Sequence, residues 1–122
     1  MKFLLLIHGD ERERRSLPDS ERHAVAGAFA ALADRARDEG RLLGAAQLHP
    51  TERATTVRVV DGETVVTDGP YAETSEPLAG CALVEAASID EAVELVEELA
   101  PPREPGGVEV RPVHEEDGGE GS

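Results

Sequence analysis

Aromatic residues are scarce in this chain of 122 residues, which has two phenylalanines, one tyrosine and no tryptophan. A buried core must therefore consist mainly of Leu, Val, Ile and Ala side chains. Basic residues are also few: 12 Lys and Arg stand against 26 Asp and Glu, which gives a formal net charge of −14. So acidic a chain repels nucleic acids and anionic membranes, and it lacks the aromatic rings that stack on bases. We therefore expect no nucleic-acid partner and no membrane partner.

Cysteine and long apolar segments are equally scarce. Cys81 is the only cysteine, so no disulfide can form within the chain, and a reducing compartment is the expected environment. The apolar start at residues 3–7 is too short for the core of a signal peptide, and no small-residue cleavage site follows it. No segment approaches the length of a transmembrane helix. These absences predict a cytoplasmic protein.

Short apolar runs and amphipathic segments alternate along the rest of the chain, and this pattern predicts an α+β fold. A β-hairpin with its turn at Asp61-Gly62 is expected between the second and third core strands. Without that hairpin the order is β-α-β-β-α-β, which is the ferredoxin-like split βαβ plan with both helices on one face of an antiparallel sheet. The expected core strands are 3–7, 41–49, 81–86 and 107–114, and the expected helices are 19–39 and 88–100.

Both helices carry recognisable boundary signals. Pro18 precedes the first helix and Gly40 ends it, whereas Ser88 and Glu91 form a capping box at the start of the second. Apolar side chains at helical spacing predict the buried faces. These are Val25, Ala28, Phe29, Leu32 and Ala36 in the first helix, and Ile89, Ala92, Val93, Val96 and Leu99 in the second.

The domain boundary follows from the last strand. Residues 1–114 are expected to form one domain, in which Pro112 suggests an edge position for the last strand. Residues 115–122 have no apolar side chain to anchor them and are predicted to be a disordered acidic tail.

The first strand is apolar on both faces. Phe3, Leu5 and Ile7 point to one side and Leu4 and Leu6 to the other, yet two helices on one face of the sheet cover only one of these sides. A surface that apolar is usually an interface, so we expect a homodimer in which sheet packs against sheet. The alternative is that the inserted hairpin folds over the second face within one chain.

Three stretches of the sequence carry a resemblance to a known family. The opening "MKFLLLIHGDE", the central "TTVRVVDGETVVTDGPYAETSEPLAGCALVEA" and the ending "VEVRPV" resemble the YCII-related proteins of the DGPF type. The similarity runs from residue 1 to about residue 114 and is most specific in "DGPYAETSE". The resemblance implies a dimeric α+β barrel, a fold shared with muconolactone isomerase-like enzymes and monooxygenase-like dimers. It also implies a small enzyme with a His–Asp pair in a pocket, and a link to extracytoplasmic-function sigma factors.

The chain departs from the DGPF pattern at a few positions. Tyr71 stands where phenylalanine is usual, Ser75 where lysine is usual, and Cys81 where an aromatic residue is usual. The missing lysine removes one candidate anion contact and argues against an anionic substrate. His23 lies on the helix that carries the family's histidine, but about one turn away from that position. We therefore do not assign that role to His23.

Polar and titratable residues gather at one predicted rim of the sheet. The first and second core strands end there, next to His8 with Asp10 and to His49, and the unusually long polar loop 68–79 leads into the third core strand at the same place. We predict that the loop walls a pocket. The candidate catalytic residues are Asp68, His8, His49 and Glu73, and the candidate substrate-binding residues are Tyr71, Thr74, Ser75 and Asp10.

Each of these residues also has an ordinary structural interpretation. Asp68 suits a turn, Thr74 and Ser75 suit the cap of a helical turn, and the remaining loop charges suit solvent. The sequence contains no phosphate loop, dinucleotide motif or nucleophile elbow, and no metal-binding spacing, so no cofactor or metal is expected. Two functions remain open. One is a cofactor-independent enzyme that uses carboxylate and histidine acid–base chemistry on a small organic molecule; the other is a non-catalytic ligand-binding or accessory module.

Overall fold

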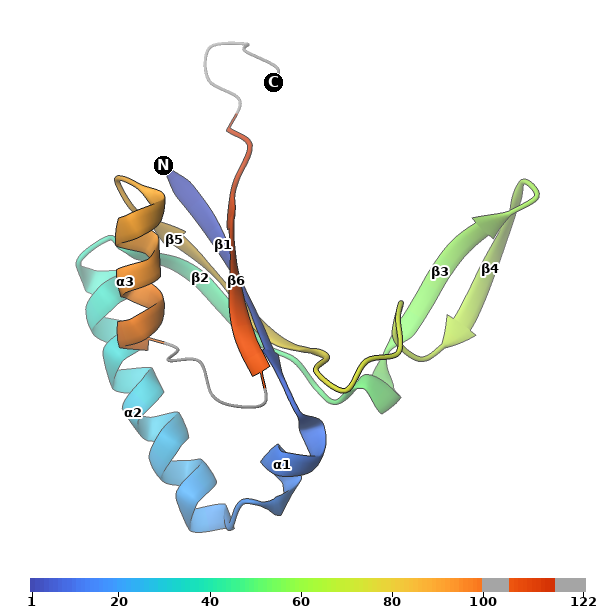
Figure 1. The fold of residues 1–122 in the computed structure, drawn as a ribbon, viewed down its shortest axis with the longest axis horizontal. Helices are drawn as coiled ribbons and strands as arrows, with labels where there is room; N and C mark the ends of the chain where they lie inside the picture. The colour runs from blue at the N-terminus through green and yellow to red at the C-terminus, as the bar shows by residue number, and fades with distance from the viewer. Residues whose placement is uncertain (100–105, 116–122) are drawn as a thin grey trace.

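The structure is a computed structural model that describes residues 1–99 and 106–115, without the side chains of residues 14, 22 and 24–29. The described elements follow one another along the chain as Figure 1 shows. They are β1 (Lys2–Gly9), α1 (Glu11–Ser16), α2 (Asp19–Asp38), β2 (Leu42–Gln47), the 3-10 helix η1 (Thr51–Arg53), β3 (Thr55–Val60), β4 (Glu63–Asp68), β5 (Leu78–Glu85), α3 (Ile89–Leu99) and β6 (Gly106–Pro112).

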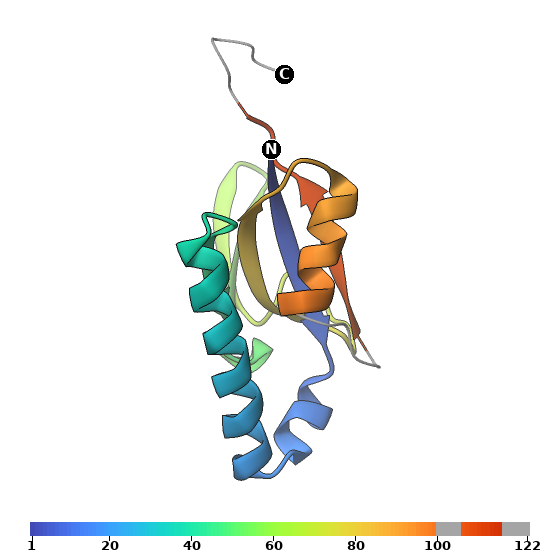
Figure 2. The same cartoon turned by 90° about the vertical axis from the view of Figure 1, so that its left-hand side faces the viewer.

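Four strands form one sheet in the order β2-β5-β1-β6. Every neighbouring pair in it is antiparallel, so β1 and β2 run parallel to each other with β5 between them. Figures 1 and 2 show α2 and α3 on the same face of this sheet. The prediction of an α+β fold with a mostly antiparallel sheet is confirmed, and the arrangement is consistent with a ferredoxin-like fold. Within the described residues, none of the helices combines the length and the apolar character needed to cross a membrane.

The core lies between the sheet and the two helices. Phe3, Leu5 and Val84 are the largest fully buried side chains. They share one face of the sheet, because alternate residues of a strand and directly paired residues point to the same side, and they cluster there with residues of α2 and α3. Leu42, Ala33 and Ala36 join them from β2 and α2, and most of the cluster is aliphatic, as the scarcity of aromatic residues predicts.

The buried face of α3 differs in part from the prediction. Ala92, Val96 and Leu99 are buried as expected, but Leu95 is buried as well, whereas Ile89 and Val93 are 44% and 43% exposed. At 100° per residue, positions 92, 95, 96 and 99 form one stripe, and positions 89 and 93 lie at its flank. The helix thus turns its Leu95 side towards the sheet, a choice that packing makes and the apolar pattern alone does not.

The boundaries of α2 agree with the sequence signals. Pro18 stands at its N-cap, and Gly40 follows its end with a φ of 75°, a left-handed conformation that glycine adopts without strain. The N–H of Arg41 donates to the carbonyl oxygen of Ala36 across this end. Of the predicted buried stripe, Leu32 and Ala36 lie at the core, whereas the side chains of Val25, Ala28 and Phe29 fall outside the described residues.

The predicted hairpin is present as β3 and β4, and the turn residues Asp61 and Gly62 have φ values of 51° and 82°. Figure 1 shows the hairpin diverging from the sheet. Val57 and Val59 are 62% and 72% exposed, so the alternative in which the hairpin folds over the second face of the sheet is wrong.

The face of the sheet opposite α2 and α3, here called the open face, carries half-buried side chains. They are Leu4 and Leu6 of β1 and Cys81 and Leu83 of β5.

The last strand, β6, lies at one edge of the sheet and ends three residues before the last described residue, Glu115. β6 pairs with β1 alone and is an edge strand, as Pro112 predicted. Of the acidic tail predicted at residues 115–122, Glu115 is described and the remainder falls outside the described residues.

Candidate functional site

Backbone pairing brings the last residues of β1 and β2 to the same rim of the sheet, as predicted. Ile7 at the end of β1 and Gln47 at the end of β2 both pair with Gly80, near the start of β5. A polar contact ties together the segments that follow β1 and β2. Thr51 donates to the carboxylate of Glu11 from its backbone N–H at 2.8 Å and from its hydroxyl at 3.1 Å. The rim is thus held by side chains as well as by strand pairing.

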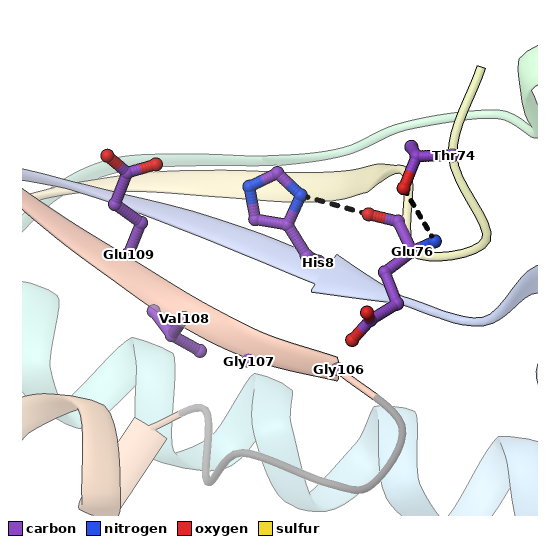
Figure 3. Close-up of a pocket in the computed structure, with 7 residues that line it drawn as sticks. All are labelled: His8, Thr74, Glu76, Gly106, Gly107, Val108 and Glu109. Carbon is purple, nitrogen blue, oxygen red and sulfur yellow. Dashed lines mark hydrogen bonds between the residues drawn. The ribbon is translucent and has the colours of Figure 1, made fainter. Parts of the chain in front are cut away.

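A hollow of about 400 Å³ opens beside the end of β1, widely accessible to solvent. Its walls come from β1, from the polar loop and from β6, which are far apart in the sequence but adjacent in space (Figure 3). The residues that line it are His8, Thr74, Glu76, Gly106, Gly107, Val108 and Glu109.

His8 is held in one orientation in this hollow. Its Nδ1 lies 3.2 Å from the backbone carbonyl oxygen of Glu76. A carbonyl oxygen can only accept a hydrogen bond, so Nδ1 carries the proton and donates it. In the neutral ring, Nε2 is then the unprotonated nitrogen with a free lone pair. Figure 3 shows this second nitrogen on the side of the ring that faces away from Glu76.

The end of the polar loop supports this arrangement. The hydroxyl of Thr74 accepts a hydrogen bond from the N–H of Glu76 at 3.1 Å, which makes a compact turn. The carbonyl oxygen of Pro77 accepts the N–H of Gly9 at 3.1 Å, and the Pro77 side chain is buried. The loop is therefore fixed to β1 directly after Glu76, and the turn that Thr74 closes lies directly before it. The loop is long enough to bring the carbonyl oxygen of Glu76 within hydrogen-bonding distance of His8.

The loop is shorter than the predicted range 68–79. β4 extends to Asp68 and β5 begins at Leu78, so residues 68, 78 and 79 of that range belong to strands. The reason is that β5 begins before the predicted strand 81–86, because its first residues pair with the ends of both β1 and β2. Gly69 follows the hairpin directly, and its N–H donates to the carbonyl oxygen of Ala54.

The structure brings His8 and Thr74 together in the hollow, but it does not place the other candidates among the lining residues. His49 is exposed between β2 and η1, Asp68 is the exposed last residue of β4, and Glu73 and Ser75 are exposed loop residues. Their assignment as functional residues stays a prediction.

Tyr71 has a specific partner outside the hollow. The guanidinium carbon of Arg58 lies 4.4 Å from the centre of the Tyr71 ring, and Arg58 also donates to the Tyr71 carbonyl oxygen at 3.0 Å. The ring itself is 74% exposed. This cation–π contact fixes the start of the loop on the hairpin. In the described structure Tyr71 therefore belongs to the hairpin side of the loop.

Asp10 makes a local contact that its candidate role did not include. Its Oδ1 accepts the backbone N–H of Arg12 at 2.8 Å and that of Glu13 at 3.3 Å. Those are the contacts of an N-cap, and they begin α1, a short helix that the sequence analysis did not predict. The signal was present, because Asp10 stands immediately before acidic and basic residues with good helix propensity.

Sequence reasoning missed Glu109 of β6. Leu6 pairs with Glu109, so these two side chains lie on the same face of the sheet. His8 is two residues after Leu6 in β1 and therefore lies on that face as well. The ionic contact of Glu109 with Arg111 is loose: Oε2 of Glu109 lies 3.9 Å from Nε of Arg111, and both side chains are more than half exposed.

Among the described residues, no three His, Cys, Asp or Glu side chains gather closely enough to hold a metal ion.

Comparison with known proteins gives one family and a close relative. The family model of the YCII-related domain matches residues 1–117. An uncharacterized protein of Rhizobium meliloti (strain 1021) is 36% identical over 114 residues, which cover 93% of this chain and 92% of the relative. The matched segment contains β1, the polar loop and β6, which together build the hollow around His8. On the agreement of the family model and this relative over nearly the whole chain, the protein belongs to the YCII-related family.

Proposed function

We propose that the protein binds a small organic molecule in the hollow beside His8 and uses Nε2 of His8 to take a proton from it. The observation that carries this proposal is the hydrogen bond between Nδ1 of His8 and the carbonyl oxygen of Glu76. That bond leaves the basic nitrogen free, and the hollow provides space for a ligand next to it. A histidine with a fixed tautomer and a free second nitrogen has the features of a general base.

The proposal includes a second copy of the chain. The open face carries Leu4, Leu6 and Leu83 without a covering helix, and a sheet of this kind is commonly buried against another sheet. A dimeric α+β barrel formed through the open faces would also reduce the solvent access of the hollow, because His8 lies on the same face as Leu4 and Leu6. Exclusion of water strengthens the electrostatic interactions on which proton transfer depends.

Proton transfer can be tested without knowing the substrate. Metabolite mixtures are incubated with the protein in heavy water, and NMR detects any C–H position that exchanges for deuterium. A general base that removes a proton from carbon produces such exchange even when no product accumulates. The matched variant is His8→Asn, whose amide nitrogen can take the place of Nδ1 and donate to Glu76 but which has no counterpart of Nε2.

We expect exchange of at least one compound with the wild-type protein and none with His8→Asn, while the two proteins unfold at similar urea concentrations. Exchange at the wild-type rate in His8→Asn would remove His8 from the mechanism. Binding without any exchange in the wild-type protein would reject the removal of a proton from carbon by His8 and favour a ligand-binding module.

A second candidate function is an accessory module that binds another protein, and the hairpin favours it. Val57 and Val66 form a cross-strand pair, and Val59 lies on the same side of the hairpin; the three side chains are 62%, 64% and 72% exposed. Apolar side chains gathered in this way are common at protein interfaces. The sigma-factor link implied by the family resemblance stays a prediction. Co-purification of a partner with the wild-type protein, but not with Val59→Asp, would support this function, whereas equal recovery with both would reject the hairpin as the surface.

A further inference from the structure

The side chains of His8 and Glu109 share one face of the sheet. His8 lies opposite Gly107 on β6, and Leu6 lies opposite Glu109. Residues directly opposite each other in an antiparallel pair point to the same side, so the four positions belong to the open face. Figure 3 shows the Glu109 carboxylate and the His8 ring projecting from the same side of the two strands, and the ring nitrogen not bonded to Glu76 lies on the side of Glu109.

The space between these two side chains is open. Gly107, the residue opposite His8, has no side chain, and a β-carbon built on it would meet no atom within 4 Å. A ligand can therefore approach the backbone of β6 there while it contacts both Nε2 of His8 and the carboxylate of Glu109. The other lining carboxylate, Glu76, is turned to the opposite side of β1 in Figure 3, so Glu109 is the acid that faces the histidine.

The polar groups at this point are acceptors. A carboxylate has no hydrogen to donate, and Nε2 of the neutral His8 ring is an acceptor because Nδ1 carries the proton. None of the described residues that line the hollow is a lysine or an arginine. Arg111 is only a weak competitor for Glu109, because the pair is exposed and its N–O distance is 3.9 Å. The net charge of −14 further favours approach by cations.

We infer that the hollow takes an organic cation that carries N–H groups, such as a protonated amine, and that Glu109 determines this specificity. The positive charge and its N–H groups lie against the carboxylate of Glu109, next to Nε2 of His8. This inference rests on the proposed function in that both use His8. It goes further by naming the class of ligand and the residue that selects it.

The test uses two probes of equal length and opposite charge, butylamine and butyrate. The ring C–H signals of His8 are followed by NMR while each probe is added to the full-length protein in mildly alkaline buffer, which favours neutral imidazole. The variants are Glu109→Gln and Glu94→Gln. Glu94 is an exposed residue of α3 outside the hollow, so both variants lose the same charge and differ only in where they lose it.

We expect butylamine to shift the His8 signals and butyrate to leave them unchanged. Glu109→Gln should weaken the binding of butylamine about ten-fold, since a hydrogen bond to a charged group is lost, and Glu94→Gln should not weaken it. Stronger binding of butyrate, no response to butylamine, or an equal effect of both variants would each overturn the inference. The result is independent of the deuterium-exchange experiment, because amine binding and proton abstraction are measured separately.

Discussion

Gly80 of β5 lies so close to β2 that a β-carbon at this position would be 2.9 Å from the carbonyl oxygen of Ala46. Real β-carbons do not approach backbone atoms so closely, so only glycine fits here without movement of a strand. Gly80 is also the residue that pairs with the ends of both β1 and β2. The close approach therefore determines how the rim beside the hollow is assembled.

Gly80→Ala should lower the free energy of unfolding by about 1–3 kcal/mol, because the methyl group forces two strands apart. The matched control is Gly44→Ala in β2, where a β-carbon would meet no atom within 4 Å. That variant should be neutral or slightly stabilising. Urea unfolding followed by circular dichroism measures both. Equal stability of the two variants would mean that β5 and β2 are not as close as described.

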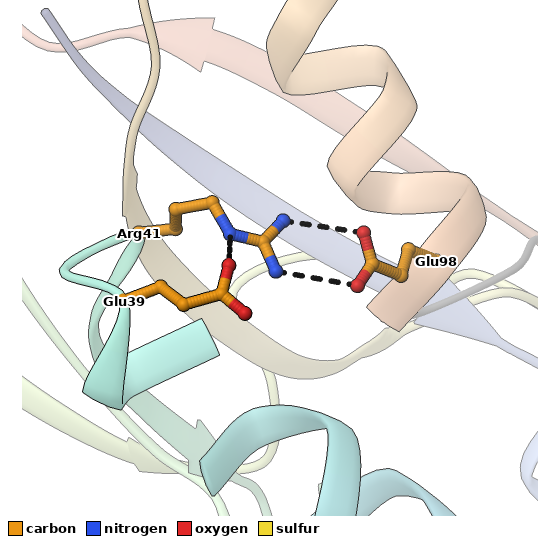
Figure 4. Close-up of polar contacts among 3 residues, drawn as sticks. All are labelled: Glu39, Arg41 and Glu98. Atoms are coloured by element: carbon orange, nitrogen blue, oxygen red, sulfur yellow. Dashed lines mark hydrogen bonds and ion pairs between the residues drawn. The ribbon is translucent and has the colours of Figure 1, made fainter. Parts of the chain in front are cut away.

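Arg41 joins the end of α2 to α3 (Figure 4). Its Nε donates to Glu39 at 2.9 Å, and its terminal nitrogens donate to the two oxygens of Glu98 at 3.2 Å and 3.3 Å. The hydrogen bond from Arg41 lowers the pKa of Glu98 below its ordinary value of 4.5. A carboxyl group whose pKa is lowered by folding stabilises the fold above its unfolded pKa, and this contribution disappears as the pH falls through the folded pKa.

Glu98→Gln should therefore reduce stability at neutral pH, and the difference from the wild-type protein should shrink as the pH falls below 4.5. The effect should be small, since the pair is near the surface. Urea unfolding of both proteins at several pH values gives the comparison. A difference that stays constant across the acidic range would show that the ionised form of Glu98 is not what matters.

Leu4→Glu tests the proposed dimer. Leu4 pairs with Leu83 on the open face, so a charge there would be buried without a partner if two sheets pack together, which costs several kcal/mol. We expect light scattering to give twice the chain mass of 13.0 kDa for the wild-type protein and a single chain mass for Leu4→Glu. Val93→Glu, on the exposed flank of α3, is the control and should stay dimeric. A monomeric wild-type protein would reject the dimer.

Asp10 should behave as a helix cap. Asp10→Ala is expected to cost about 1 kcal/mol of stability, because the N–H groups of Arg12 and Glu13 lose their acceptor. Asp10→Ser keeps an acceptor oxygen and should cost little. Thermal unfolding measures the difference. If alanine leaves stability unchanged but weakens ligand binding, Asp10 is a binding residue as the sequence analysis predicted.

Thr74 should act on His8 through the turn that it closes. Thr74→Val removes the hydroxyl that accepts the N–H of Glu76, whereas Thr74→Ser retains it. The valine variant should lose about 1 kcal/mol or less, because the turn is exposed. Its distinctive effect should be on the imidazole: nitrogen NMR should show a mixture of the two tautomers of His8 in place of one. An unchanged tautomer in Thr74→Val would show that the Glu76 carbonyl is held by other contacts.

The features that the sequence determined by itself are local. Asp61-Gly62 is a hairpin turn because those residues tolerate positive φ, and Gly40 ends α2 for the same reason. The N–H of Glu91 bonds to the hydroxyl of Ser88, as the capping signal predicted. The order of the strands and of the helices α2 and α3, though not the short helix α1, could be read from alternating apolar runs. β6 lies at the edge of the sheet, as Pro112 indicated.

Tertiary structure decided which distant residues meet. The pairing of His8 with Gly107 brings Glu109 to the histidine, and the path of the loop brings Glu76, and not Asp68, to its Nδ1. Packing against the sheet selected Leu95 over Val93 for the buried face of α3. Strand register and loop path depend on contacts between residues far apart in the chain, and a shift of one residue reverses which side chains share a face. Local residue patterns do not contain that information, so the hollow around His8 emerges only from the assembled sheet.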